Sequence, residues 1–362
     1  MPGPEIFVLG SDGNLWLETG PYGPPNIPPF RTPVDGNVDL FAAFQAFSSQ
    51  QVFVCGSDGN LWLEQGPWGK VPLPDSSYPP GPGSRYQIDG NVAAFWAWSP
   101  QEVFVLGRDG NLWLEFGFGT TNPTVPPPRT PIDGNVAGFQ PLSLQEVFVL
   151  GGDGNLWQEL ASFGAVPLPS CNGGTSSCRN QVDAHVLDFW AVDSDHVFVL
   201  GTDHNLWLEQ GPFGQQIPPF RGPVDRNAAL VQAIDADQAF VVGTDDNLWL
   251  ENSPFGVVPL PPCSQTSGFG QGFGCRDFIF SNVAAFGYFP DAGGMYVVDG
   301  NLDFWQVGPP NVQIDGSVIA FQPLSSEQTQ LRTTIRHRSG RRTLRPVRAS
   351  RHRHPSHLLG RP

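Results

Sequence analysis

The sequence is poor in charge, in long apolar runs and in leader features. Charged residues make up 15% of the 362 positions. No stretch approaches the roughly 20 consecutive apolar residues that a membrane helix needs, so we expect no membrane insertion. The N-terminus, MPGPEIFVLG, has neither a basic region nor a long apolar run, so it does not predict a signal peptide.

Basic residues are scarce outside the C-terminus. Ten of the 19 lysines and arginines lie between Leu331 and Pro362, where no acidic residue occurs. The other nine accompany 34 acidic residues, which gives the rest of the chain a net charge of −25. Because attraction to phosphate requires a positive surface, this acidic body disfavours nucleic acid as a partner.

Recognisable catalytic and metal-binding motifs are missing as well. The sequence contains no HExxH, GxSxG or P-loop pattern. Its repeated Asp-Gly-Asn turns lack the spacing and the distal glutamate of a calcium loop. Before the basic tail, the histidines are His185, His196 and His204, and each replaces a commoner residue of a repeat. We therefore predict that the protein is not an enzyme and uses no cofactor and no metal.

Glycine and proline, by contrast, are abundant, with 43 and 38 copies, and aromatic residues reach 12%. This composition is typical of many short strands joined by tight turns. The strands belong to a repeat whose clearest marker is a tryptophan after Asn-Leu, with a damaged copy, DGNLDFW, at the end. The tryptophans are Trp16, Trp62, Trp113, Trp157, Trp207, Trp249 and Trp305.

A second marker of the type VDGNV also occurs seven times. It begins at Val34, Ile88, Ile132, Val182, Val224, Ile314 and, in a degenerate copy (IFSNV), at Ile279. The unit from residue 88 reads IDGN-VAAFWAWS-PQ-EVFVLG-RDGN-LWLE and ends in a proline-rich return. The apolar runs have strand length, RDGN is a hairpin turn, and proline confines the return to a sheet edge.

Each unit therefore predicts a four-stranded antiparallel sheet that must stack on its neighbours, which is the pattern of a β-propeller blade. The last copy, residues 314–328, stops after its first strand, and the N-terminus begins without one. Joined, the two ends complete one blade and hide the edges that an open sheet would expose. We expect an all-β protein with one domain, a seven-bladed propeller over residues 1–328, closed by strands from both termini.

The first six units share a glutamate and an arginine that the seventh lacks. The glutamates are Glu18, Glu64, Glu115, Glu159, Glu209 and Glu251. The arginines are Arg31, Arg85, Arg129, Arg179, Arg221 and Arg276. Val307 and Asn311 hold the two places in the seventh unit. Joint presence and joint absence indicate that the side chains touch, either as a structural pair between two strands or as binding groups for sugar hydroxyls.

Aromatic residues pose the same choice. We expect the tryptophans of LWLE to pack between sheets. Those in Gly-Pro-aromatic-Gly turns and a related Ser-Pro turn are candidate sugar platforms or, equally, hydrophobic staples: Tyr22, Trp68, Phe213 and Phe255. Phe118 and Phe163 occupy similar places without the full motif.

The interval from the glutamate to the arginine alternates, being 13, 21, 14, 20, 12 and 25 residues. Two of the long inserts hold cysteine pairs, in CNGGTSSC (171–178) and CSQTSGFGQGFGC (263–275). Their equivalent placement predicts two local disulfides, Cys171 with Cys178 and Cys263 with Cys275, and so an extracellular or otherwise oxidising compartment. Cys55 replaces a leucine of the repeat, and we expect it to be buried.

The tail, residues 329–362, departs from the repeat and is rich in Arg, His, Ser and Pro. It reads either as an anion-binding arm or as out-of-frame translation. Both readings predict disorder.

The unit VAAFxxxSxxEVFVLGxDGNLWLE resembles the repeat of seven-bladed propeller lectins, such as the fucose-binding Photorhabdus lectins, and more loosely those of the Psathyrella velutina lectin and the tectonins. The resemblance covers residues 5–328 and rests on the first strand, the VFVxG strand and the Leu-Trp hairpin. It implies glycan binding at shallow clefts between blades, without catalysis. The proline-rich outer strand differs from the Trp-rich strand of that family.

A multivalent lectin for glycans or glycoconjugates is therefore the first expectation, since several equal sites on a rigid ring gain avidity. A structural or protein-interaction propeller is the alternative. An enzyme with a site at one mouth of the ring is the third possibility.

Overall fold

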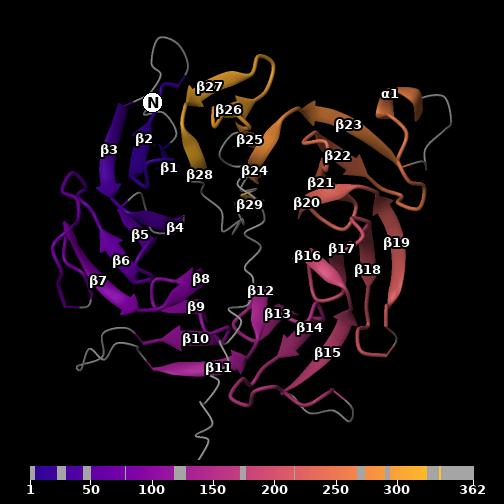
Figure 1. The fold of residues 1–362 in the computed structure, drawn as a ribbon, viewed down its shortest axis with the longest axis horizontal. Helices are drawn as coiled ribbons and strands as arrows, with labels where there is room; N and C mark the ends of the chain where they lie inside the picture. Colours follow the sequence, from indigo (N-terminus) through magenta and orange to yellow (C-terminus); the bar gives the residue numbers. More distant parts are fainter. Residues whose placement is uncertain are drawn as a thin grey trace, which may run out of the picture.

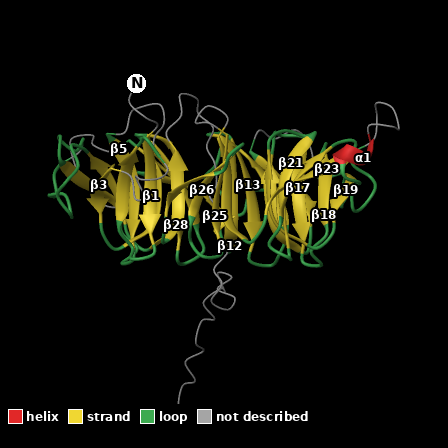
Figure 2. Cartoon of the chain, turned by 90° about the horizontal axis from the view of Figure 1, so that it is seen from above, coloured by secondary structure: helices red, strands yellow, loops and turns green. Residues whose placement is uncertain are grey.

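A computed structural model describes residues 5–22, 30–43, 50–77, 79–117, 128–171, 177–215, 217–266, 274–289, 294–323 and 334–335. The described residues form seven β-sheets arranged as blades around a central axis (Figure 1). Seen from the side, the ring is a flat disc with the turns on its two faces (Figure 2). The predicted seven-bladed propeller is confirmed.

Blade 1 is the sheet β28-β1-β2-β3, and blades 2 to 6 follow as β4 to β7, β8 to β11, β12 to β15, β16 to β19 and β20 to β23. Blade 7 has the order β27-β26-β25-β24-β29. The innermost strands of the repeat are β28 (Val318–Pro323), β4 (Val38–Ala43), β8 (Val92–Ser99), β12 (Val136–Ser143), β16 (Val186–Ala191), β20 (Ala228–Ala233) and β24 (Val283–Phe289).

The second strands are β1 (Glu5–Gly10), β5 (Gln51–Gly56), β9 (Glu102–Gly107), β13 (Glu146–Gly151), β17 (His196–Gly201), β21 (Gln238–Gly243) and β25 (Gly294–Asp299). The third strands are β2 (Leu15–Thr19), β6 (Leu61–Gln65), β10 (Leu112–Phe116), β14 (Leu156–Leu160), β18 (Leu206–Gln210), β22 (Leu248–Asn252) and β26 (Phe304–Val307).

The outer strands are β3 (Phe30–Asp35), β7 (Ser84–Asp89), β11 (Arg129–Asp133), β15 (Cys178–Asp183), β19 (Phe220–Asp225), β23 (Cys275–Phe280) and β27 (Val312–Asp315). The described residues also include one short helix, α1 (Cys263–Thr266), and the two-residue strand β29 (Thr334–Ile335).

The Asp-Gly-Asn turns connect the second and third strands as predicted. In the first of them, the Asp12 carboxylate accepts hydrogen bonds from the Asn14 backbone N–H at 3.0 Å and from its side-chain amide at 2.7 Å. Gly13 has a φ of 76°, a conformation that glycine adopts without steric cost. The turn is thus stabilised by its own side chains, which accounts for these aspartates without a bound metal.

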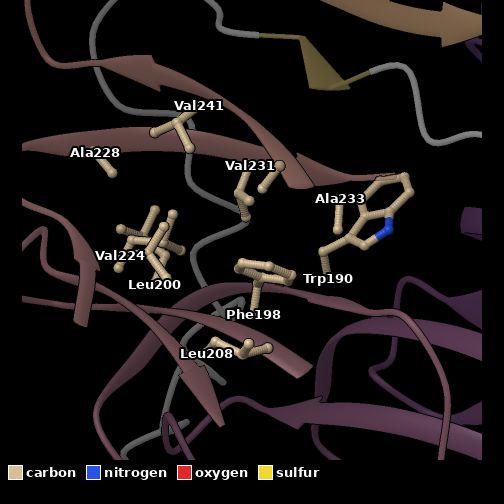
Figure 3. Packing of buried hydrophobic residues seen from close by; sticks show 11 residues of the cluster. Trp190, Phe198, Leu200, Leu208, Val224, Ala228, Val231, Ala233 and Val241 are labelled. Atoms are coloured by element: carbon tan, nitrogen blue, oxygen red, sulfur yellow. The ribbon is translucent and has the colours of Figure 1, made fainter. Parts of the chain in front are cut away.

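The hydrophobic core lies between the blades rather than in one central cluster. In Figure 3, Trp190, Phe198 and Val224 of blade 5 face Val231 and Val241 of blade 6. Each second strand is buried on both faces because its blade packs between two neighbouring blades, as the continuous VFVL runs indicate. A blade removed from the ring would therefore expose both faces of its sheet.

The ring closes as expected between the two ends of the repeat region. Strand β28 pairs antiparallel with β1, with Phe321 opposite Val8 and Pro323 opposite Ile6. Phe321 is fully buried, and its ring centroid lies 4.5 Å from that of Phe304 in blade 7. The closing strand thus contributes to the core as well as to the sheet.

The two cysteine pairs are bonded as the sequence predicts. The disulfides Cys171–Cys178 and Cys263–Cys275 are present, and Cys55 is buried with a free thiol. Most of the tail lies outside the described residues. Its segment β29, however, pairs with β24 near the centre of the ring (Figure 1), a contact that the sequence analysis does not predict.

The closing strand yields a first prediction. Phe321→Ala is expected to lower the free energy of unfolding by about 3–5 kcal/mol, because it leaves a cavity among buried aromatic rings. The matched substitution Phe220→Ala, at a side chain that is 73% exposed, should change it by less than about 0.5 kcal/mol. Denaturant unfolding of the two variants measures the difference, and equal losses would contradict closure through β28.

Candidate functional site

Within the described chain, the same four side chains meet at six of the seven blade boundaries. We call each group a clasp: a tryptophan, a glutamate and an arginine of one blade, with an aspartate of the preceding blade. In blade order, the clasps are Trp16/Glu18/Arg31/Asp315, Trp62/Glu64/Arg85/Asp35, Trp113/Glu115/Arg129/Asp89, Trp157/Glu159/Arg179/Asp133, Trp207/Glu209/Arg221/Asp183 and Trp249/Glu251/Arg276/Asp225.

Strand register brings the three groups of one blade together. In blade 3, Glu115 of β10 lies directly opposite Arg129 of β11. Side chains of directly opposed residues share a face of the sheet, and so do those of Trp113 and Glu115, which are two residues apart on one strand. The Arg129 guanidinium lies 4.2 Å from the centroid of the Trp113 ring, a cation–π arrangement.

Each arginine then bridges two blades. Arg129 lies 3.7 Å from Glu115 in its own blade and 3.7 Å from Asp89 in the preceding one. The contact between arginine and glutamate, which their joint absence in the seventh unit indicated, occurs within 4 Å in five clasps. In the remaining clasp Arg85 lies 2.9 Å from Asp75 and 4.0 Å from Asp35 instead.

The glutamates of the clasps are fully buried. Burial raises the pKa of Glu115 from its ordinary value of 4.5 to about 9, and the Asp89 carboxylate raises it in the same sense while Arg129 opposes it. The neutral form also supplies an O–H donor toward Asp89, which the ionised form lacks. The clasp therefore favours the protonated form of the glutamate.

The other clasps behave alike. Burial, followed by the facing aspartate, raises the pKa to about 9 in Glu18, Glu64 and Glu209, and to about 8 in Glu159 and Glu251.

Access to the clasps is limited to the arginine and the tryptophan. The glutamate carboxylates are 0% exposed, whereas the arginine side chains are between 17% and 35% exposed. The tryptophans are half-buried beneath them. A ligand approaching from solvent would therefore reach the guanidinium but not the glutamate, which favours the structural interpretation of that residue.

The boundary between blades 6 and 7 has no clasp. Val307 and Asn311 replace the glutamate and the arginine, and Phe280 stands where the other markers have aspartate. The Phe280 ring packs on Trp305 with centroids 6.2 Å apart. All three polar members are thus absent together at one boundary.

The aspartates are the site residues that the sequence reasoning missed. The signal was present: IFSNV, the degenerate marker, has Phe280 in place of aspartate and adjoins the one unit without the glutamate and the arginine.

The turn aromatics reach back to the preceding blade. Trp68 packs edge-on against Phe7 at 6.2 Å, and Phe255 against Phe198 at 5.8 Å. Tyr22 packs against a core cluster that joins residues of blades 1 and 7, and its hydroxyl donates to the Glu18 carbonyl at 3.4 Å. These contacts support the second of the two interpretations above, in which the rings are hydrophobic staples between blades.

Phe213 shows this most clearly. It packs edge-on against Phe148 at 6.1 Å and is only 5% exposed, because the preceding blade covers it. An exposed sugar platform is not compatible with that burial. Phe163 packs in a cluster with blade 3 residues, and Phe118 lies outside the described residues.

Other chemistry-bearing groups have local roles. The His196 ring lies 3.0 Å from Asp193, and His204 Nδ1 lies 3.1 Å from the Ala228 carbonyl. The described residues include no group of three or more His, Cys, Asp or Glu side chains placed to hold a metal ion. No helix in the described part of the chain has the length and apolar character to cross a membrane.

Comparison with known proteins adds no family. No protein-family model matches the sequence, and no curated protein matches it significantly. Among solved structures, the WD40 β-propeller domain of Doa1 is similar with a TM-score of 0.45 and 10% identity over 90% of each chain. Prp20p of Saccharomyces cerevisiae has a TM-score of 0.45 and 13% identity over 89% of this chain and 91% of its own. Human WBSCR16 has a TM-score of 0.40 and 12% identity over 70% of this chain and 75% of its own.

The buried glutamates predict how stability depends on pH. Their pKa is higher in the folded protein than the ordinary 4.5, so the folded state binds more protons than the unfolded state between pH 5 and 9. The contribution of these glutamates to stability is then complete below pH 4.5 and is lost as the pH rises toward 9. The denaturant midpoint measured across this range should decrease steadily.

Glu115→Gln isolates one clasp in that measurement. The amide is neutral at every pH, so this variant should lose less stability than the wild type between pH 6 and 9. Glu102→Gln, at a half-buried glutamate of β9 outside the clasps, provides the control and should run parallel to the wild type. A parallel curve for Glu115→Gln would contradict the raised pKa.

A clasp should also be transferable to the seventh boundary. Phe280→Asp alone is expected to cost about 2 kcal/mol, because it removes the ring contact with Trp305 and adds an unpartnered carboxylate. Adding Val307→Glu and Asn311→Arg should recover at least half of that loss, since neighbouring groups couple by about 0.5–3 kcal/mol. Unfolding of the single, double and triple variants measures the coupling, and strict additivity would disprove it.

Proposed function

We propose that this propeller is a non-catalytic scaffold that binds other proteins through its outer surface. The repeated charged groups are engaged between blades, whereas apolar side chains are exposed at the circumference. Seven of the ten exposed large apolar residues in the described chain lie on outer strands or on the returns before them: Phe30, Val71, Val166, Ile217, Phe220, Val257 and Phe278. Aromatic side chains are enriched at protein–protein interfaces, so the exposed phenylalanines of the rim supply contacts that a partner protein can use.

The absence of catalysis is part of the same proposal. A carboxyl with a raised pKa is a candidate general acid only if a substrate reaches it. The clasp glutamates are fully buried between blades and are repeated six times. Both properties support a role in stability rather than in chemistry.

A multivalent lectin remains the second candidate, on one specific observation. The arginines of blades 1, 3 and 5 are 29–35% exposed above a tryptophan ring, so their outer N–H groups are open to sugar hydroxyls. Equal sites on a rigid ring would bind multivalent glycoconjugates with avidity. In this case the arginines rather than the glutamates would carry the contacts.

The two disulfides are compatible with an oxidising compartment. We place the scaffold there, so its partners are to be sought among secreted proteins or cell-surface proteins.

Two measurements separate the candidates. The first is binding of the full chain to a panel of free monosaccharides and to a glycan array. The second is capture of partners from material secreted by the source cells, with wild type and with the double variant Phe30→Ser/Phe220→Ser. Both side chains are more than 70% exposed, so the fold should be retained.

If the protein is a scaffold, we expect no binding to monosaccharides or to the glycan array. We also expect the amount of captured partner to fall at least about fivefold in the double variant. Capture that disappears after enzymatic deglycosylation of the secreted material, or in the presence of free sugar, would overturn it in favour of the lectin.

A further inference from the structure

The outer edges of the even-numbered blades are covered by the chain itself. In blade 2, the Arg85 backbone N–H donates to the Pro74 carbonyl at 3.0 Å, and the Ser76 N–H donates to the Arg85 carbonyl at 2.8 Å. Residues 75 and 85 form a parallel β-bridge. The sequence that lies along the edge is VPLPD, residues 71–75, which we call the covering segment.

Blades 4 and 6 repeat this arrangement. The Arg179 N–H donates to the Pro169 carbonyl at 2.8 Å, and the Arg276 N–H donates to the Pro261 carbonyl at 2.9 Å. The central leucine of each VPLP sequence is 1–2% exposed: Leu73, Leu168 and Leu260. In blade 4 the Cys171 N–H also donates to the Arg179 carbonyl, at 3.2 Å. A backbone hydrogen bond from the arginine N–H and a buried leucine are thus common to the three segments, and blades 2 and 4 add a bond to the arginine carbonyl.

The edge of blade 5 has the same register, but none of the described residues forms a covering segment along it. Arg221 of β19 lies opposite Glu209, as Arg179 lies opposite Glu159 in blade 4, so its backbone N–H and carbonyl point outward. The return is short, with 12 residues from glutamate to arginine against 20 in blade 4. No backbone group of the described residues pairs with the Arg221 N–H or carbonyl.

A partly exposed arginine and two exposed apolar side chains lie at this edge. The Arg221 side chain is 35% exposed, whereas that of Arg85 is 17% exposed beneath its covering segment. Phe220 and Ile217 are 73% and 47% exposed. In blade 2 an acidic residue of the covering segment, Asp75, pairs with the arginine at 2.9 Å, which identifies the complementary charge.

We propose that the edge of β19 binds an extended segment of a partner protein with the pattern apolar-Pro-Leu-Pro-acidic, which adds to the sheet as a parallel strand. The inference rests on the proposed scaffold function and names its partner class. In the bound segment, the carbonyl of the residue equivalent to Pro74 accepts from the Arg221 N–H, and the N–H of the residue equivalent to Ser76 donates to the Arg221 carbonyl. The acidic residue, equivalent to Asp75, pairs with the guanidinium. Strands β3 and β11 also follow short returns, but most of each return (residues 23–29 and 118–127) lies outside the described residues.

The test uses the protein's own covering segment as the probe. A labelled peptide of residues 70–77, KVPLPDSS, is titrated into the full-length protein by fluorescence anisotropy. Saturable binding is expected. It should weaken about tenfold when the residue equivalent to Ser76 is N-methylated, because one backbone hydrogen bond is lost, and by a similar factor with lysine in place of Asp75. Equal binding of all three peptides would overturn strand addition.

A protein variant locates the site. Residues 70–84 are grafted in place of residues 215–220, which gives blade 5 the covering segment of blade 2, and the fold is checked by thermal unfolding. The stoichiometry of peptide binding should fall by one site. A peptide with photo-leucine at the position of Leu73 should crosslink to residues 217–223 in the wild type but not in the graft. An unchanged stoichiometry, or crosslinks elsewhere only, would disprove the assignment to β19.

The outcomes distinguish this inference from the proposed function. Absence of peptide binding together with sugar-independent capture of partners would remove the β19 assignment and leave the scaffold. Absence of both would remove the two together.

Discussion

The arginine shared between two blades is the interaction on which the ring depends. A propeller blade is linked covalently to its neighbour only by a short turn, such as residues 36–37 between β3 and β4, so its position around the axis must be set by contacts across the boundary. The clasp provides these contacts in a directional form: Arg129 reaches Glu115 in its own blade and Asp89 in the preceding one. Because burial raises the pKa of the glutamate to about 9, its neutral form is favoured, which limits the charge that the clasp brings into the interior.

Apolar packing works alongside the clasps and is less specific. The second strands are buried on both faces, and the core clusters join residues of adjacent blades. The boundary between blades 6 and 7, where Phe280 packs on Trp305, shows that an apolar contact takes the place of the clasp there. The turn aromatics extend this packing toward the rim, since each reaches back to the blade before it. Both the clasps and the turn aromatics thus join each blade to the blade before it.

The alternation of long and short returns gives the circumference a different character from the interior. Inside, six boundaries are equivalent in the described chain. Outside, the even blades are covered by their own VPLP segments, whereas no described segment covers the edge of β19. An open edge with a partly exposed arginine and an exposed phenylalanine is suited to binding extended chain segments. The interior repeat therefore accounts for the fold, and the departures from regularity at the rim account for the proposed function.

The sequence by itself determined the number of blades, the hairpins, the ring closure and the two disulfides. These features depend on patterns that are local or that repeat at a fixed period, such as DGN turns, VFVL runs and CNGGTSSC. Only the tertiary structure decided that Asp89 joins Arg129 from another blade, that Phe213 is buried by Phe148, and that β29 pairs with β24. The physical reason is that each of these contacts joins neighbouring sheets or an irregular segment, where the partner is set by how surfaces fit in space and not by spacing along the chain.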